Sequence, residues 1–171
     1  MDLKDFIGVT EGFPKPGISW KDVSPLLANP EAFHQCIGEI AAWAKDKGAN
    51  LVIGPESRGF LFGCPVAYEL GLPFGMARKK GKLPGKTYCT SYNLEYGSDV
   101  IEIPASSLKK GDRVLLIDDL MATGGTLLAL EDLVKSVGAE VVGVATVIEL
   151  TDFDGSKKLG APFMSLVKYP H

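Results

Sequence analysis

Apolar side chains in the first part of the chain follow two different periods. Across residues 30–47 they recur every three or four positions, which predicts a helix that is capped by Asn29 and ended by Gly48. The short aliphatic run at 51–54 predicts a buried strand instead, and a second helical pattern follows at 60–70. A helix, a strand and another helix therefore succeed one another in this region.

The same alternation continues to residue 148. Strand-like segments at 73–77, 113–117 and 140–148 are combined with a helical pattern at 125–137. Strands that alternate with helices predict a parallel sheet whose faces are covered by those helices. The expected fold class is therefore α/β, with a central parallel β-sheet flanked by helices.

One segment, residues 78–104, interrupts this alternation. It opens with RKKGKLPGKT at 78–87, a basic loop that contains glycine and proline. The residues after this loop have the pattern of two antiparallel strands that turn near 95–98. We expect an inserted β-hairpin that carries a flexible loop.

Composition and charge limit the classes of protein. The chain has 171 residues, of which 46% are hydrophobic and 23% charged, so we expect one domain over 1–171. The formal net charge of -3 provides no general basic field for nucleic acid. The acidic N-terminal segment is unlike a secretion signal, and no stretch is apolar for long enough to cross a bilayer. We expect a soluble, cytoplasmic protein without nucleic-acid or membrane partners.

The three cysteines, Cys36, Cys64 and Cys89, are far apart along the chain and far from both histidines. This spacing fits neither a disulfide framework nor a zinc cluster. We expect reduced thiols that are mostly buried.

The strongest chemical signal is the stretch VLLIDDLMATGGT at 114–126. A strand ends in Asp118 and Asp119 and leads through a glycine loop into a helix, at the sheet edge where α/β proteins bind ligands. The glycines let the backbone approach a phosphate, which the loop N–H groups and the hydroxyls of Thr123 and Thr126 can bind. Two carboxylates suit vicinal sugar hydroxyls or a hydrated Mg²⁺, contacted through water with no direct metal ligand predicted. A ribose 5-phosphate satisfies both halves of the motif.

A second polar group follows the neighbouring strand. Ser57 and Arg58 come just after the strand at 51–54 and reach the same sheet edge, where their hydroxyl, backbone N–H and guanidinium groups can contact an anion. The loop after the next strand adds three cations, Arg78, Lys79 and Lys82. The edge therefore combines acids with a cluster of positive charge.

These motifs resemble those of the type I phosphoribosyltransferases and, more narrowly, those of the adenine phosphoribosyltransferase family. The signature of the wider family is an aliphatic strand, two acids and a T-G-G-T or T-G-x-T phosphate loop. The narrower resemblance covers nearly the whole chain and includes FPKPGISWKDVSPLL (13–27), GPESRGFLFG (54–63), ARKKGKLPG (77–85), YNLEYG (92–97) and IEL (148–150).

The resemblance implies an activity and an assembly. The expected enzyme transfers 5-phosphoribosyl from 5-phosphoribosyl 1-diphosphate to N9 of adenine, giving AMP and diphosphate in purine salvage, with Mg²⁺ as cofactor. A homodimer is expected. Residues 1–28 would form a small hood that binds the base, and residues 78–104 would form the flexible loop, whose tip closes over the substrates.

The resemblance also implies roles for individual residues. The diphosphate is expected at Ser57, Arg58, Arg78, Lys79 and Lys82, and the ribose 5-phosphate at Asp118, Asp119, Ala122, Thr123, Gly124, Gly125 and Thr126. Adenine is expected at Ser19, Trp20, Lys21 and Leu150. The expected catalytic residues are Glu95, which handles the proton of the base, Tyr96, which packs over the anomeric centre, and Arg58.

Three other functions compete with this interpretation. The tripeptide at 85–87 is like the end of a Walker A motif, but Lys80 occupies the place of the first glycine and no helix follows. An enzyme for xanthine or a 6-oxopurine is an alternative, although 141–155 contain no lysine or arginine to recognise a 6-oxo group. A regulator that keeps the site as a sensor is another, although no added DNA-binding segment is present.

Overall fold

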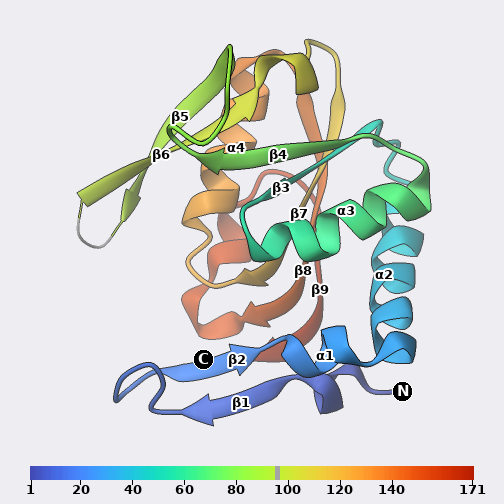
Figure 1. The fold of residues 1–171 in the computed structure, drawn as a ribbon, viewed down its shortest axis with the longest axis vertical. Helices are drawn as coiled ribbons and strands as arrows, with labels where there is room; N and C mark the ends of the chain where they lie inside the picture. Colours follow the sequence, from blue (N-terminus) through green and yellow to red (C-terminus); the bar gives the residue numbers. More distant parts are fainter. Residues whose placement is uncertain (95–96) are drawn as a thin grey trace.

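The computed structural model describes residues 1–94 and 97–171. Its centre is a seven-stranded sheet, and a separate two-stranded sheet lies below it in Figure 1. In sheet order, the seven strands are β5 (Thr87–Leu94), β6 (Gly97–Pro104), β4 (Phe74–Lys79), β3 (Leu51–Pro55), β7 (Arg113–Met121), β8 (Glu140–Leu150) and β9 (Phe163–Tyr169).

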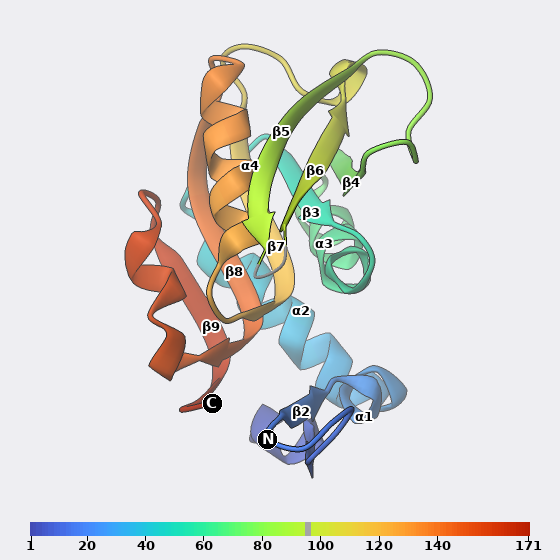
Figure 2. The same ribbon diagram turned by 90° about the vertical axis from the view of Figure 1, so that its left-hand side faces the viewer.

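The central strands are parallel, as the alternating pattern predicts. β4, β3, β7, β8 and β9 run in the same direction and pair in that order. Helices α2 (Pro30–Lys45) and α3 (Arg58–Leu70) cover one face, and α4 (Gly125–Ser136) covers the other, as Figure 2 shows. The predicted fold class is confirmed.

Burial on both faces explains why the central strands are aliphatic throughout. In β3, Val52 packs with α2 and α3, whereas Leu51 and Ile53 pack with α4. In β7, Leu115 likewise packs on the face covered by α2 and α3, and Leu116 packs on the face covered by α4. Each fully buried aliphatic side chain contributes about 1.5–3 kcal/mol, so these strands fix the sheet that carries the site.

The predicted helices form with small differences at their ends. Asn29 caps α2 by accepting a hydrogen bond from the Ala32 N–H, at 3.0 Å. That helix ends at Lys45, before the expected stop at Gly48, and α4 ends at Ser136 instead of residue 137. Helix ends fray and often close through a last tight turn, which accounts for such shifts.

The inserted hairpin extends the main sheet. β5 and β6 are antiparallel partners, and β6 also pairs antiparallel with β4 through Arg78 opposite Glu102. The hairpin strand β5 lies along α4 in Figure 2, and the backbone carbonyl of Asn93 approaches Gly125. The predicted turn includes residues 95–96, which lie outside the described residues.

The N-terminal residues form a small unit beside the carboxyl edge of the central strands. It consists of η1 (Leu3–Phe6), the antiparallel strands β1 (Gly8–Glu11) and β2 (Ser19–Asp22), and α1 (Ser24–Ala28). The Nζ of Lys21 donates to the carbonyl of His171 at 2.8 Å, so the unit contacts the C-terminus. The hydrophobic pattern does not predict these short strands or β9.

The remaining short helices lie in connections between strands. They are η2 (Ala105–Ser107), η3 (Thr151–Phe153) and η4 (Gly155–Lys158). Within residues 1–94 and 97–171, no helix is long and apolar enough to span a membrane. The expectation that the thiols are mostly buried is wrong, because Cys36 is buried whereas Cys64 and Cys89 are exposed.

Candidate active site

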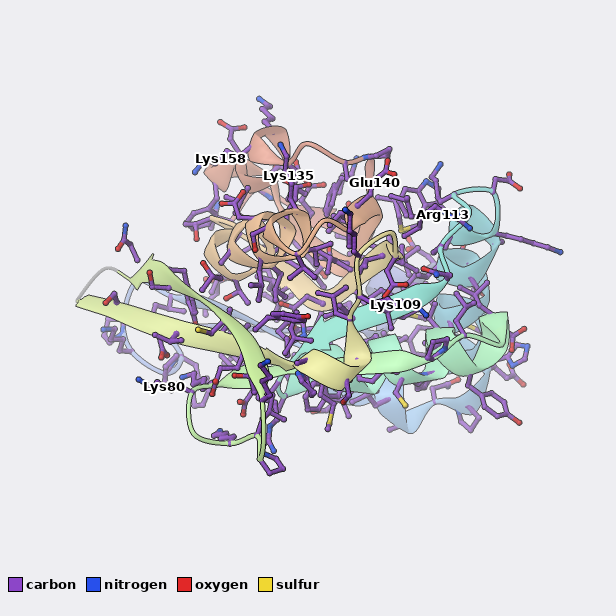
Figure 3. The ribbon with its side chains drawn as sticks, turned by 90° about the horizontal axis from the view of Figure 1, so that it is seen from above. Lys80, Lys109, Arg113, Lys135, Glu140 and Lys158 are labelled. Atoms are coloured by element: carbon purple, nitrogen blue, oxygen red, sulfur yellow. The ribbon has the colours of Figure 1, made fainter. Side chains whose placement is uncertain are left out.

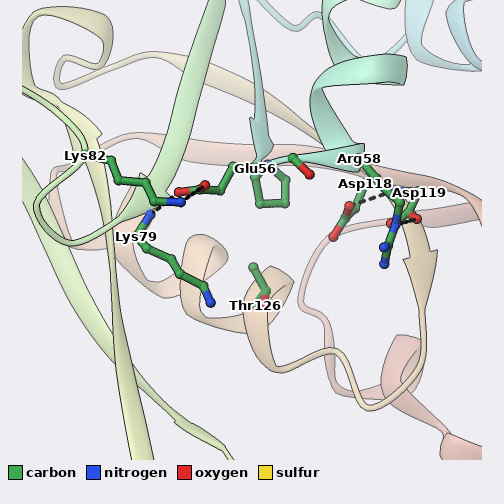
Figure 4. A pocket seen from close by; sticks show the side chains of 9 residues that line it. Glu56, Arg58, Lys79, Lys82, Asp118, Asp119 and Thr126 are labelled. Atoms are coloured by element: carbon green, nitrogen blue, oxygen red, sulfur yellow. Dashed lines mark hydrogen bonds and ion pairs between the residues drawn. The ribbon is translucent and has the colours of Figure 1, made fainter. Parts of the chain in front are cut away.

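A cavity of about 400 Å³ opens at the carboxyl ends of β3 and β7. Its lining residues are Pro55, Glu56, Ser57, Arg58, Lys79, Lys82, Asp118, Asp119 and Thr126. Figure 4 shows Lys79 with the Glu56–Lys82 pair at one side and the two aspartates with Arg58 at the other, with Thr126 between them. By contrast, the view in Figure 3 shows Lys109, Arg113, Lys135 and Glu140 around the opposite, amino edge.

Glu56 organises the cationic side of the cavity. Its carboxylate accepts hydrogen bonds from Lys82 Nζ at 2.6 Å and from the Lys79 backbone N–H at 2.6 Å, and Arg78 Nη2 lies 3.6 Å away. Burial opposes ionisation, but these hydrogen bonds and positive charges together lower the pKa of Glu56. The carboxylate therefore gathers the cations of the loop.

The acidic side contains two neighbouring carboxylates and one guanidinium. Asp119, 7% exposed, accepts a hydrogen bond from Arg58 Nε at 2.5 Å. Burial, followed by the negative charge of Asp119, raises the pKa of Asp118 well above its usual range. The ion pair with Asp119 raises the pKa of Arg58. A hydroxyl donor or a cation at this pair would favour the ionised form of Asp118.

A smaller cavity of about 170 Å³ adjoins the acids. The loop at 122–126 lines it together with Asp118, Leu120 and Leu127. Gly124 has a φ of 82°, a left-handed conformation that glycine adopts without strain, and it precedes the first turn of α4. The loop thus turns sharply from the end of β7 into the helix.

The two helices that begin at the site have N-termini that are open to an anion. In the part of the chain described here, neither α3 nor α4 has a side-chain hydrogen bond at its N-cap, unlike α2. The first-turn N–H groups of a helix have no intrahelical partner and carry partial positive charge. Both helix starts can therefore bind phosphate groups.

The N-terminal unit reaches the site through Trp20. The Cζ of Arg58 lies 5.6 Å from the centroid of the Trp20 ring, and Phe13 packs edge-on against the same ring. Lys21 points elsewhere, because its Nζ bonds Ser19 Oγ at 2.5 Å and lies over the Tyr169 ring. Tyr169 pairs with Leu150 in the β8–β9 ladder, so the expected base-binding residues occupy one end of the molecule.

The family comparison agrees with this arrangement. The sequence family described as "Phosphoribosyl transferase domain" matches residues 23–162, which include every residue that lines the two cavities. The chain belongs to the phosphoribosyltransferase family. Relatives that are 51–52% identical over 99% of the chain are adenine phosphoribosyltransferases.

Two sequence relatives illustrate the likeness. The adenine phosphoribosyltransferase of Clostridium acetobutylicum is 52% identical over 170 residues, with 99% of each chain covered. The enzyme of the same name from Clostridium tetani is 51% identical, again over 99% of each chain. The similarity therefore spans the hood segment, the sheet and the C-terminal strand.

Solved structures show the same fold. The adenine phosphoribosyltransferase of Thermoanaerobacter pseudethanolicus superimposes with a TM-score of 0.93 at 44% identity and 98% coverage of both chains. The Saccharomyces cerevisiae enzyme, in complex with an imino-altritol bisphosphate and adenine, gives a TM-score of 0.91 at 36% identity and 96% coverage of both chains. The phosphoribosyltransferase fold predicted from the sequence is thus shown.

This phosphoribosyltransferase brings most of the predicted site residues together. Ser57, Arg58, Lys79, Lys82, Asp118, Asp119 and Thr126 line the larger cavity, and Ala122, Thr123, Gly124 and Gly125 line the smaller one. Arg78 is outside the lining and faces Glu56; its Nε is buried without a hydrogen-bond partner among the described residues. The predicted catalytic residues Glu95 and Tyr96 lie outside the described residues.

Sequence reasoning missed Glu56. The residue lies inside the quoted motif GPESRGFLFG, yet no role was predicted for it. An acid at the end of a buried strand is a weak signal by itself, because its cationic partners, Arg78 and Lys82, come 22 and 26 residues later in the chain. Only the pairing of β3 with β4 brings them together.

Proposed function

We propose that the chain is a Mg²⁺-dependent adenine phosphoribosyltransferase that converts adenine and 5-phosphoribosyl 1-diphosphate into AMP and diphosphate. The single observation that carries the proposal is the joining of three features at one sheet edge. These are the cationic cavity, the aspartate pair and the phosphate loop, all within a fold shared with adenine phosphoribosyltransferases.

The larger cavity suits the diphosphate that leaves. Its breaking bond to the anomeric carbon places negative charge on oxygen, which the start of α3, Arg58 and Lys82 can stabilise. Lys79 adds a further cation to the same cavity. Glu56 holds Lys82 at the cavity before the substrate arrives. A diphosphate in this cavity then competes with Glu56 for Lys82.

The aspartate pair suits the ribose. Such displacements pass through oxocarbenium-like transition states, so positive charge develops on the sugar while the C1–oxygen bond breaks and the bond to N9 forms. Carboxylates that accept hydrogen bonds from the ribose hydroxyls hold the ring, and their negative charge stabilises the positive charge that develops on the sugar. The loop at 122–126 and the start of α4 then bind the 5-phosphate at the other end of the sugar.

The base is assigned to the N-terminal hood, residues 1–28. Trp20 offers an aromatic face for a purine, and main-chain groups of Ser19 and Lys21 offer hydrogen bonds to its edge. Leu150 would cover the other face. By resemblance, Glu95 is the proton-handling group and hydrogen-bonds the N7 side of the purine while N9 loses its proton. Tyr96 covers the anomeric centre from the flexible loop, residues 78–104.

The residues present fit Mg²⁺. Asp118 and Asp119 form a carboxylate pair with Arg58 as the neighbouring cation, and burial, followed by the negative charge of Asp119, raises the pKa of Asp118. Mg²⁺ usually keeps several waters and binds one or two carboxylates together with substrate phosphates. When bound, the ion would supply positive charge that offsets part of the negative charge of the diphosphate. Asp118 and Asp119 would hold it through water, which calorimetric titration of Mg²⁺ into protein saturated with ribose 5-phosphate can measure.

Product formation with four bases tests the proposal. Adenine, hypoxanthine, guanine and xanthine are offered separately with Mg²⁺ and 5-phosphoribosyl 1-diphosphate, and nucleotide products are separated by chromatography. AMP as the sole product is expected. Turnover of another purine in place of adenine would move the assignment to a 6-oxopurine or xanthine enzyme. No product, despite binding of both substrates, would contradict the transferase assignment and favour a sensor.

A homodimer is part of the same proposal. An apolar groove of about 900 Å³ lies between α2 and α3, lined by residues that include Phe33, Ile37 and Leu61. Tyr68 at its edge is 87% exposed, and large exposed apolar patches commonly mark interfaces. A second copy is the proposed occupant, because the resemblance implies a homodimer. Helix α3, which lines this groove, begins at Arg58, so the interface would adjoin the helix that starts at the site. Sedimentation should give a dimer that Tyr68→Asp weakens; an active monomer would contradict this assignment.

A further inference from the structure

The phosphate loop at 122–126 is backed by a segment that follows β8. Gly155 is buried, although Asp154 before it is exposed and Ser156 after it is only half-buried. A Cβ atom built on Gly155 would overlap the carbonyl oxygen of Ala122 and would lie 2.9 Å from the carbonyl carbon of Thr123. The backbone of η4 therefore touches the backbone of the loop, and a side chain at Gly155 would force them apart.

A buried carboxylate holds this segment in place. Glu149, near the end of β8, is 9% exposed and accepts hydrogen bonds from Ser156 Oγ and from Ser165 Oγ, each at 2.8 Å. Ser156 directly follows Gly155, and Ser165 lies on β9. Glu149 also pairs across the sheet with Met121, the residue before the loop. One side chain thus ties β9 and η4 to β8, whose backbone pairs with β7, the strand that leads into the loop.

We propose that Gly155 and Glu149 are positioning residues for the 5-phosphate site, an inference that rests on the proposed function. Neither residue lines the two cavities described above. The loop N–H groups bind a phosphate only while the peptide planes from 122 to 126 keep their orientation. Contact with Gly155 from behind, fixed through Ser156 and Glu149, maintains that orientation before the substrate binds.

Five variants separate positioning from overall stability. Gly155→Ala inserts a methyl group against the loop, and Gly160→Ala is its matched control, because the nearest atom to a Cβ there is 3.6 Å away. Glu149→Ala removes both hydrogen bonds, whereas Glu149→Gln keeps a partner for each serine. Ser156→Ala removes one hydrogen bond and carries the test if Gly155→Ala does not fold.

Kinetics gives the first readout. Gly155→Ala and Glu149→Ala should raise the KM for 5-phosphoribosyl 1-diphosphate by about tenfold or more while the KM for adenine stays unchanged. Ser156→Ala should show a smaller rise, and Glu149→Gln and Gly160→Ala should resemble the wild type. Equal rises in both KM values, or an unchanged KM for the phosphoribosyl substrate, would overturn the inference.

Hydrogen exchange in the ligand-free protein gives a readout that needs no turnover. The amides at 122–126 should exchange faster in Gly155→Ala, Glu149→Ala and Ser156→Ala than in the wild type, with other segments unaffected. Unchanged exchange in the loop would overturn the inference even if the enzyme makes AMP. A wild type that makes no AMP, with faster exchange in the variants, would overturn the proposed function alone.

Discussion

Asp118 and Asp119 are adjacent, yet replacing each with asparagine should change the stability of the ligand-free protein in opposite directions. Burial and the charge of Asp119 hold the pKa of Asp118 well above its usual range. Asparagine has nearly the same shape, and its amide oxygen can still accept the Asp119 N–H. Asp118→Asn therefore removes an unfavourable buried charge, so it should stabilise the folded state at neutral pH.

The magnitudes follow from burial and pairing. An unpaired charge held away from water is unfavourable, and its removal by a single isosteric substitution changes stability by about 1 kcal/mol, so Asp118→Asn should add about that amount. Asp119→Asn breaks the ion pair with Arg58, whose side chain is 55% exposed, so water screens the pair and the loss is about 1 kcal/mol. For a domain of this size, each change shifts Tm by about 2–4 °C.

The stability difference should depend on pH in a defined direction. Because the folded-state pKa of Asp118 is raised, its contribution to wild-type stability is fully present below the unfolded value of 3.8. That contribution is lost as pH rises through the folded value. The advantage of Asp118→Asn over the wild type should therefore be absent at low pH and largest at neutral pH.

Thermal unfolding and turnover, measured together, test this reasoning. Both variants should lower kcat/KM by about 10- to 100-fold, because hydrogen bonds to a charged group contribute about 1.5–3 kcal/mol. Asp132→Asn, at an exposed position on α4, is the matched control and should change neither quantity. Tm shifts of the same sign for the two site variants, or wild-type kcat/KM in Asp118→Asn, would refute the reasoning.

Three further predictions concern groups around the site and in the core. Glu56→Gln should lower the free energy of unfolding by about 1 kcal/mol at neutral pH, measured by urea denaturation. Because the folded pKa of Glu56 is lowered, this difference should vanish as pH falls through that value, and a difference that persists would contradict the ion pairing. Lys82→Ala should raise the KM for 5-phosphoribosyl 1-diphosphate, whereas Lys80→Ala, outside the cavity lining, should not; equal effects would argue against a specific contact. Burial raises the pKa of Cys36 to about 12, so mass spectrometry should find iodoacetamide on the two exposed thiols and on Cys36 only after unfolding.

The central fold could be predicted because its signals are local. Aliphatic runs such as 51–54 are buried on both faces, and Asn29 and Gly71 mark helix ends by chemistry that acts within a few residues. The positions of Asp118 and Asp119 follow from the same logic, because parallel strands end at one sheet edge. The structure therefore brings Ser57, Arg58, Asp118 and Asp119 to one cavity as expected, whereas Arg78 lies outside its lining and Glu56 inside it.

Other parts depend on contacts between distant segments. The strands of the N-terminal hood are only partly buried, so their composition lacks a clear period of two. Glu56 and Gly155 gain their roles from partners that lie far away in the chain. The exposure of Cys64 likewise depends on which face of α3 packs on the sheet. Such features require the three-dimensional arrangement, because no short window of sequence contains both partners.

Arg58 links the parts of the site that bind different portions of the substrates. Its Nε contacts Asp119 beside the proposed ribose site, and its guanidinium lies against Trp20 in the proposed base-binding hood. It is also the first residue of α3, whose open N-terminus faces the cavity proposed for the diphosphate. The contact with Asp119 occupies one of several guanidinium N–H groups, so others can donate to a diphosphate. A lysine would supply the charge but could not keep a carboxylate contact, an aromatic contact and a phosphate contact together. The planar guanidinium is therefore the feature through which diphosphate binding reaches both the acid pair and the base segment.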